Sequence, residues 1–310
     1  MLLLFLDGVG LGAPGPDNPL STRRWPHLER LAGGAWTSGL PERTRPTHVV
    51  RHLDATLGVE GLPQSGTGQA ALFTGENTAA LHGAHYGPTP PTTVRALVRA
   101  RSVFARLRDA GVPREALAFA NAYPDRFFEM VETRGRWTTT TLAASAAGVR
   151  LRRASDLLAG RALAADLSGA TWQRLFTPEL CVLSPADAGA ALARLTRAHR
   201  FTLFEFFLTD KAGHSRDAAR AEAVLADLDA FVGGLLAGFG AARPDGAPER
   251  LVVVTSDHGN LEALGTKSHT RHPVPLLAWG PGADAFAAAT SLLDVTPACV
   301  EAVVRSAEAL

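Results

Sequence analysis

Apolar residues fall along this chain in two kinds of pattern. Short continuous apolar runs, which are typical of buried strands, lie at residues 2–6, 118–122, 201–208, 251–254 and 274–279. Longer segments with apolar residues at helical spacing lie at residues 26–31, 92–110, 186–198, 215–236 and 291–307. Because strands and helices alternate, we predict an α/β fold with a largely parallel central sheet and helices on both of its faces.

Two regions depart from this alternation. Residues 13–50 are rich in Pro, Arg and Gly, and we predict that most of this region is loop. Residues 124–184 show a weak pattern, with short helical pieces and few clean strands. We therefore predict a small cap-like insertion at 124–184, carried on a core that is formed by residues 1–123 and 185–310.

Carboxylate and imidazole side chains recur where predicted strands end. Asp7 follows the first run, Asp210 and His214 follow the run at 201–208, and Asp257 and His258 follow the run at 251–254. Open α/β sheets bind ligands beyond the carboxyl ends of their strands, so we expect these side chains to converge. Mixed oxygen and imidazole ligands favour zinc or manganese over calcium, which prefers oxygen alone.

A single residue of this kind is weak evidence. One Asp after a strand often caps a turn, and one His is more often hydrogen-bonded structure than a ligand. Here, however, the joint pattern extends to a further pair, His269 and His272. Together these side chains are sufficient to hold two metal ions, and they predict a metal site.

The net charge and the two cysteines limit the binding partners and the cellular compartment that we expect for this protein. The net charge of +1 on 310 residues provides no basic field for nucleic acid, and we interpret Arg150, Arg152 and Arg153 as a solvated face. Cys181 and Cys299 form no CxxC pair and are expected to be buried free thiols in a reducing compartment. No apolar run reaches the length of a membrane span or a signal sequence, so we expect a cytoplasmic protein without a membrane partner.

Four motifs carry a resemblance to a known family. They are LFLDGVG at 4–10, DKAGH at 210–214, TSDHGN at 255–260 and SHTRHPVP at 268–275. In this order they resemble the metal motifs of the alkaline phosphatase superfamily, in the branch of cofactor-independent phosphoglycerate mutase and phosphopentomutase. The resemblance implies two divalent metal ions, manganese or zinc. It implies one metal held by Asp7, Ser65, Asp257 and His258, and the other held by Asp210, His214 and His269.

The resemblance also implies a hydroxyl nucleophile. The mutases have Ser or Thr, then two residues, then Gly-His, and residues 65–69 keep this frame with Gln69 in place of the His. Ser65 is the nucleophile in that frame, and Thr67 is the reserve candidate. A hydroxyl is a poor nucleophile until a metal or a base activates it, so a metal-bound Ser65 fits the implied chemistry.

Other polar residues are candidates for the same site. Of 31 Lys and Arg residues only Lys211 and Lys267 are lysines, and we predict that Lys211 serves as a compact cation for a phosphoryl oxygen. We expect Gln69, Asn121 and Arg271 to bind substrate.

Hydrolase and mutase share this machinery and differ in the group that accepts the phosphoryl. Because a mutase has to exclude water and the predicted insertion is small, we expect hydrolysis of a small phosphate mono- or diester through a phosphoserine. Phosphomutase action is the alternative. Sulfate or phosphonate chemistry and a non-catalytic metal-binding protein of the same fold also stay open, as do the substrate and the oligomeric state.

Overall fold

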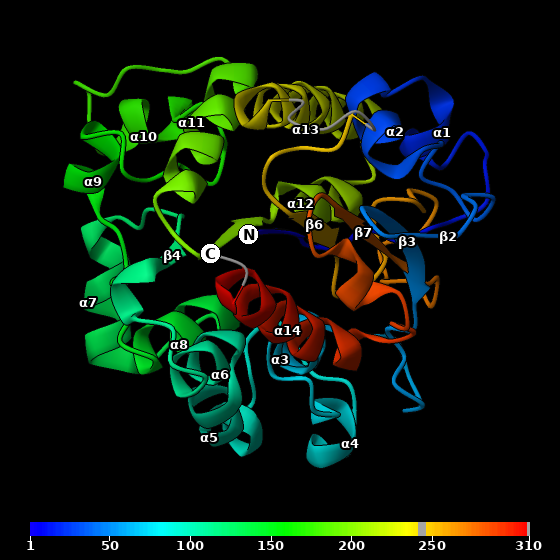
Figure 1. The fold of residues 1–310 in the computed structure, drawn as a ribbon. Helices are drawn as coiled ribbons and strands as arrows, with labels where there is room; N and C mark the ends of the chain where they lie inside the picture. Colours follow the sequence, from blue (N-terminus) through cyan, green and yellow to red (C-terminus); the bar gives the residue numbers. More distant parts are fainter. Residues whose placement is uncertain (241–245, 309–310) are drawn as a thin grey trace.

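A seven-stranded sheet organises the chain in the computed structural model, which describes residues 1–240 and 246–308 (Figure 1). The strand order is β2-β3-β7-β6-β1-β5-β4. The strands are β1 Leu2–Leu6, β2 Arg43–Arg45, β3 His48–Leu53, β4 Leu117–Phe119, β5 Phe201–Phe206, β6 Val252–Thr255 and β7 Val274–Trp279. The first strand therefore lies in the middle of the sheet, between β5 and β6.

The sheet is parallel at its centre and antiparallel at one side. β1 pairs in parallel with both β5 and β6, and β4 pairs in parallel with β5. β7 runs antiparallel to β6, and β3 antiparallel to β7. A parallel connection needs a long crossover, usually a helix, whereas residues 256–273 form a loop without one. The α/β fold with a largely parallel sheet is confirmed.

Helices cover both faces, because the strands are apolar on both. Along β1, Leu3 and Phe5 join one hydrophobic cluster while Leu2, Leu4 and Leu6 join the other. Figure 1 shows one helical layer below the sheet and one above it. The lower layer holds α3 Ser65–Thr74, α4 Thr78–His82, α5 Thr92–Arg101, α6 Val103–Asp109, α8 Thr139–Ala146 and α14 Val295–Glu308. The upper layer holds α1 Pro19–Thr22, α2 Pro26–Ala32, α11 Pro185–Arg197 and α13 Ala218–Phe239. None of the helices in the described residues has the length and apolarity needed to cross a bilayer.

Three sequence-based predictions about elements were wrong in detail. Residues 13–50, predicted as mostly loop with a helix at 26–31, contain that helix as α2 and also α1, β2 and the first half of β3. The strand β3 forms because Val49 and Leu53 are buried on one face of the sheet and Val50 on the other. The single helix predicted at 92–110 is two helices, since Ser102 is extended and its hydroxyl accepts a hydrogen bond from Ala105 N. The strand predicted to run to residue 208 ends at Phe206, where a helix, α12 Leu208–Ser215, follows almost at once.

The segment 124–184 lies beside the β4 edge of the sheet (Figure 1). It contains α7 Asp125–Arg134, α8, α9 Ala154–Leu158 and α10 Ala170–Leu175. Leu142 and its neighbours on α8 belong to the main core, whereas Trp172 and Leu180 belong to a small separate cluster. The segment thus contributes to the body of the fold, and its division from the core at 124 and 184 stays a prediction.

Candidate metal centre

Three neighbouring strands deliver acidic residues to one end of the sheet. Asp7 directly follows β1, Asp257 lies just beyond β6, and Asp210 lies in the first turn of α12 after β5. The turn after β1 needs glycine, because Gly8 has φ 70° and a Cβ there would lie 2.6 Å from Oδ1 of Asp210. The hydroxyl of Thr209 donates to Asp7 O at 2.6 Å and ties α12 to this turn.

The first group of ligand atoms consists of Asp7, Asp257 and His258, all buried. Their candidate ligand atoms lie within 4.8 Å of one another. His258 Nε2 is 3.4 Å from Asp7 Oδ1 and 3.4 Å from Asp257 Oδ2. Neither of these two carboxylate oxygens accepts a hydrogen bond within the described part of the chain. Buried carboxylates without donors are costly, and a divalent cation among them removes that cost.

The pKa values of these three residues are shifted by their burial and by the neighbouring charges. Burial, reinforced by the neighbouring carboxylates, raises the pKa of Asp7 well above its ordinary value. Burial, with the charge of Asp210 added, raises the pKa of Asp257 to about 8. Burial lowers the pKa of His258, which keeps its imidazole neutral and able to act as a ligand. The residues therefore fit a metal ion, because a cation would favour the ionised carboxylates and the neutral imidazole.

The second group is formed by Asp210, His214 and His269. Asp210 and His214 are four residues apart on α12, so both side chains lie on one face of the helix, with Asp210 Oδ2 3.3 Å from His214 Nε2. His269 Nε2 lies 3.1 Å from His214 Nε2 and 3.7 Å from Asp210 Oδ1. Nδ1 of His214 faces Lys267 O at 3.0 Å, and Nδ1 of His269 faces Pro63 O at 2.8 Å. Donation from Nδ1 to these carbonyls leaves both Nε2 lone pairs for a metal.

The two groups touch one another. The rings of His258 and His269 are stacked, with centroids 3.8 Å apart. Asp210, His258 and His269 also offer three ligand atoms within 4.8 Å. Oxygen and nitrogen donors of this kind suit zinc, manganese and related first-row metals. The arrangement therefore has the ligands for two adjacent divalent ions.

Ser65 stands at the first position of α3, next to the first group. Its Oγ lies 3.0 Å from His258 Nε2, and the residue is 8% exposed. Gly68 allows the helix to approach, since a Cβ there would lie 3.0 Å from Asp257 O. A helix N-terminus carries free N–H groups and a partial positive charge, which favour an anion such as a phosphoryl group. Ser65 thus combines a hydroxyl, a metal-ligand cluster and an anion-binding helix end.

Thr67, the reserve nucleophile, has a different environment. Its Oγ1 accepts a hydrogen bond from Tyr86 N at 3.1 Å and lies 3.4 Å from the carbonyls of Gln64 and Tyr86. Its side chain therefore fastens α3 to the loop around residue 86. Of the two hydroxyls, the structure brings Ser65 to the ligand group.

The remaining predicted residues divide between the site and its surroundings. Gln69 Nε2 donates to Asp7 Oδ2 at 3.3 Å and so orients a candidate ligand. Asn121 bonds the backbone of Glu205, and Arg271 donates to Gly61 O at 3.0 Å. The Lys211 ammonium lies over the Phe207 ring, 4.4 Å from its centroid. The substrate roles of Asn121 and Arg271 and the phosphoryl role of Lys211 stay predictions.

Sequence reasoning did not single out Glu262, which fastens the loops of the site. This buried carboxylate accepts hydrogen bonds from Gly10 N at 2.8 Å and Asn260 N at 2.9 Å, and also from Thr270. His272 Nδ1 is 3.0 Å from Glu262 Oε1, so His272 supports a neighbouring loop rather than joining either ligand group. The signal in the sequence was an acidic residue two positions after a metal motif.

Glu205 was also missed, although it interrupts the apolar run of β5. It is 6% exposed and accepts a hydrogen bond from Thr140 Oγ1 at 2.6 Å. Burial raises its pKa to about 7. A charged residue inside a buried strand is unusual, and this was the available signal.

Comparisons with known proteins agree with the geometry. Residues 183–305 match the family model of the Metalloenzyme superfamily, and they include every candidate ligand except Asp7 and Ser65. The phosphopentomutase of Methylobacterium nodulans is 35% identical over 99 residues, which cover 28% of this chain and 23% of that protein. The match thus spans about a quarter of the relative.

Solved structures share the fold. The PH0037 protein from Pyrococcus horikoshii aligns with a TM-score of 0.56 and 14% identity, over 98% of this chain and 96% of that chain. Alkaline phosphatase from the Antarctic bacterium TAB5 aligns with a TM-score of 0.51 and 13% identity, over 97% and 96%. Phosphoglycerate mutase of Leishmania mexicana aligns with a TM-score of 0.50 and 11% identity, over 97% and 94%.

Motifs, family model and fold together confirm the resemblance that the sequence predicted. The chain fits the alkaline phosphatase superfamily in that residues 183–305 match the Metalloenzyme superfamily model and the whole fold is shared with an alkaline phosphatase and a phosphoglycerate mutase. Part of its sequence, 28% to 45% of the chain, is similar to phosphopentomutases.

Proposed function

We propose that the chain catalyses metal-dependent phosphoryl transfer on a small sugar phosphate, as a phosphomutase whose phosphoryl carrier is Ser65. The single observation that carries the proposal is the position of Ser65 Oγ, 3.0 Å from His258 Nε2 and at the N-terminus of α3. This hydroxyl lies beside two buried carboxylate oxygens that accept no hydrogen bond from the described residues and that a cation would satisfy.

The chain's own residues supply most of what the reaction needs. The N–H groups of Ser65 and Gly66 can hold the phosphoryl oxygens, whereas those of Thr67 and Gly68 already donate to Tyr86 O and Gln64 O. Gln69 keeps the Asp7 carboxylate in place. Bound divalent ions would lower the pKa of the Ser65 hydroxyl and stabilise the charge on the entering and leaving oxygens. Asp7, Asp257 and His258 would hold one ion, and Asp210, His214 and His269 the other, with manganese or zinc as the proposed metals.

Mutase action is preferred here to the hydrolysis that the sequence alone suggested. The sequence relatives are phosphopentomutases, and a phosphoglycerate mutase shares the fold. These likenesses support isomerisation of a phosphorylated sugar, in which the phosphoserine returns its phosphoryl group to a second hydroxyl. We propose a pentose phosphate as the substrate class, on the strength of those relatives.

Hydrolysis is retained as the second candidate because the second ligand group is open. The side chains of His214 and Asp210 are 43% and 16% exposed. A phosphoserine beside this opening is accessible to water unless another part of the protein covers it. The balance between transfer and hydrolysis therefore depends on how well the bound sugar fills the opening.

The decisive experiment follows phosphorus-31 signals during turnover. The purified protein is incubated with manganese or zinc and with ribose 1-phosphate or ribose 5-phosphate. Interconversion of the two esters supports the mutase, whereas accumulation of inorganic phosphate supports the hydrolase. Absence of both products, in a protein that contains two metals per chain, would overturn the choice of substrate class.

Two variants separate the chemistry from the fold. Ser65→Ala is expected to abolish product formation while metal content falls by less than half, because the carboxylates and imidazoles remain. Thr67→Ser is the matched control on the same helix turn, and we expect it to keep most of the activity. Full activity in Ser65→Ala would exclude the phosphoserine.

A further inference from the structure

A cavity lies at the end of the sheet opposite the metal centre. Its volume is about 650 Å³, and its walls include Leu117 at the start of β4 and His199 just before β5. The metal ligands follow the other ends of β1, β5 and β6. The cavity is therefore separate from the metal centre.

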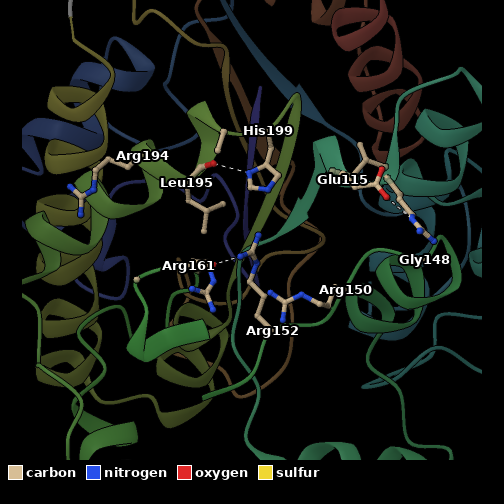
Figure 2. Close-up of a pocket in the computed structure, with 12 residues that line it drawn as sticks. Glu115, Gly148, Arg150, Arg152, Arg161, Arg194, Leu195 and His199 are labelled. Atoms are coloured by element: carbon tan, nitrogen blue, oxygen red, sulfur yellow. Dashed lines mark hydrogen bonds and ion pairs between the residues drawn. The ribbon is translucent and has the colours of Figure 1, made fainter. Parts of the chain in front are cut away.

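Arginine dominates the lining. Arg150, Arg152 and Arg161 gather at the centre of the cavity below the His199 ring, while Arg194 extends away from them (Figure 2). The one acidic residue in the lining, Glu115, is already paired with its neighbour Arg114 at 2.7 Å. In a chain whose net charge is only +1, this is a local concentration of positive charge.

One of these arginines is buried, whereas the side chains of Arg150 and Arg161 are 65% and 59% exposed and are held by an ion pair. Arg152 is buried, at 8% exposure, and donates from Nε to Phe119 O at 3.0 Å and from Nη1 to Arg161 O. Its Nη2 has no partner among the described residues. The sequence-based interpretation of Arg152 as part of a solvated face was therefore wrong, because its guanidinium is buried and donates to carbonyls of β4 and of the loop at residue 161.

A buried carboxylate fixes the other two guanidinium groups. Asp156 accepts from Arg150 Nη1 at 2.8 Å and Nη2 at 2.7 Å, and Arg161 Nη2 lies 3.4 Å away. Although burial opposes it, these partners hold the pKa of Asp156 at about 2. One carboxylate thus orients two arginines, and the three guanidinium groups keep a net positive charge.

The rest of the lining suits the non-phosphate part of an organic ligand. Leu117, Leu195 and Ala198 form an apolar wall. His199 directs Nδ1 at Leu195 O, 2.8 Å away, and burial lowers its pKa, so its Nε2 is an acceptor. The guanidinium groups suit a phosphate, the apolar wall suits an organic body, and the His199 acceptor suits a hydroxyl on that body. Together they match an organic phosphate that carries hydroxyl groups.

We propose that this cavity binds an organic phosphate of nucleotide size. Its volume lies in the range of small-molecule sites and exceeds what inorganic phosphate would fill. Guanidinium groups pair with phosphate through two parallel hydrogen bonds, which lysine does not offer. A recess with an apolar wall fits a discrete ligand better than a long polyanion.

The test is calorimetric titration of the full chain with ADP, with ribose 5-phosphate and inorganic phosphate as comparison probes. Titrations are run with manganese and again with EDTA, since binding at the metal centre needs the metal and binding in this cavity does not. We expect ADP to bind in both conditions, more tightly than inorganic phosphate. ADP binding that disappears with EDTA, or no binding at millimolar ADP, would overturn the proposal.

Two variants and a control locate the site. Arg161→Ala is expected to weaken ADP binding about tenfold through loss of a charged hydrogen bond. Arg153→Ala removes the same charge eight residues earlier, where the guanidinium pairs with Asp125 at 2.7 Å outside the cavity lining, and should change binding less than twofold. Ala198→Phe fills the cavity without changing charge and should also weaken binding. Equal losses in Arg161→Ala and Arg153→Ala, or unchanged binding in Ala198→Phe, would contradict a defined cavity and favour diffuse attraction to polyanions.

Discussion

The side chain of Asn121 pairs with the backbone of Glu205 as a strand residue would. Its Nδ2 donates to Glu205 O at 2.7 Å, and its Oδ1 accepts from Glu205 N at 2.8 Å. Asn121 is buried two residues beyond the end of β4, where the backbone has left β5. The amide thereby satisfies two backbone groups of the strand that leads to Asp210.

Asn121→Ala is expected to destabilise the protein. It leaves a buried N–H and a buried C=O of Glu205 without partners, at a cost of about 2–4 kcal/mol. Urea unfolding should show a lower midpoint with an unchanged slope. KM for the sugar phosphate should change little, because the amide is already occupied. An unchanged midpoint together with a raised KM would restore the substrate-binding role predicted from the sequence.

Replacing one candidate ligand at a time should remove one metal at a time. Asp257→Asn takes a charge from the first ligand group, and Asp210→Asn takes one from the second. Elemental analysis after dialysis is expected to show about one metal per chain in each variant and about two in the wild type. Two metals retained in both variants would place the ions elsewhere.

Gln69 acts on the metal through Asp7. Gln69→Leu keeps the size of the side chain but removes its hydrogen bond to Asp7 Oδ2. Groups that orient a metal ligand typically contribute about 10–100-fold in metal affinity. We therefore expect Gln69→Leu to bind the metal about 10–100-fold more weakly, as measured by competition with a metal-binding dye. Gln69→His should recover part of the lost affinity, since an imidazole N–H can also donate.

The His272–Glu262 contact should make stability depend on pH. The hydrogen bond to Glu262 raises the pKa of His272 above 6.5. Burial tends to raise the pKa of Glu262, but hydrogen bonds from His272 and Thr270 outweigh it and hold that pKa below 4.5. The stabilisation by His272 is complete below pH 6.5 and fades as pH rises through its folded pKa. The stabilisation by Glu262 is complete above pH 4.5 and fades as pH falls.

His272→Gln tests this window. At pH 5.5, between the two ordinary pKa values, the variant should be less stable than the wild type by about 1 kcal/mol, a modest figure because His272 is half-exposed. At pH 8.5 the difference should be smaller, because the imidazole loses its proton as the pH rises through its folded pKa. Thermal unfolding at the two pH values measures it, and a difference independent of pH would speak against the ion pair.

The sequence predicted the parts of the fold whose signal is local. β1, β6 and β7 are continuous apolar runs, and the acidic residues after β1 and β6 mark the metal end. It did not predict that Asp210 and His214 lie on a helix, because the short segment 208–215 is mostly polar and holds a glycine. Tertiary contacts, such as Thr209 to Asp7, stabilise that helix more than its own composition does.

Other features depend on neighbours that are distant in sequence. Glu262 bonds Gly10, 252 residues away, and Arg152 bonds Phe119, 33 residues away. Neither partnership has a sequence signature, because each depends on how loops meet after the sheet has formed. The metal motifs could be recognised in the sequence because each is a contiguous segment. The contacts that hold their loops, and the cavity lined by arginines, could not be predicted because they join residues that are distant in sequence.

The central position of β1 has a consequence for biosynthesis. Leu2 pairs with Thr202 on one side and with Val252 on the other. At a translation rate of roughly 5–20 residues per second, β1 leaves the ribosome about 10–40 s before its first partner strand is made. During that interval five consecutive apolar residues have no native strand beside them. We therefore expect slower translation to increase aggregation of the growing chain.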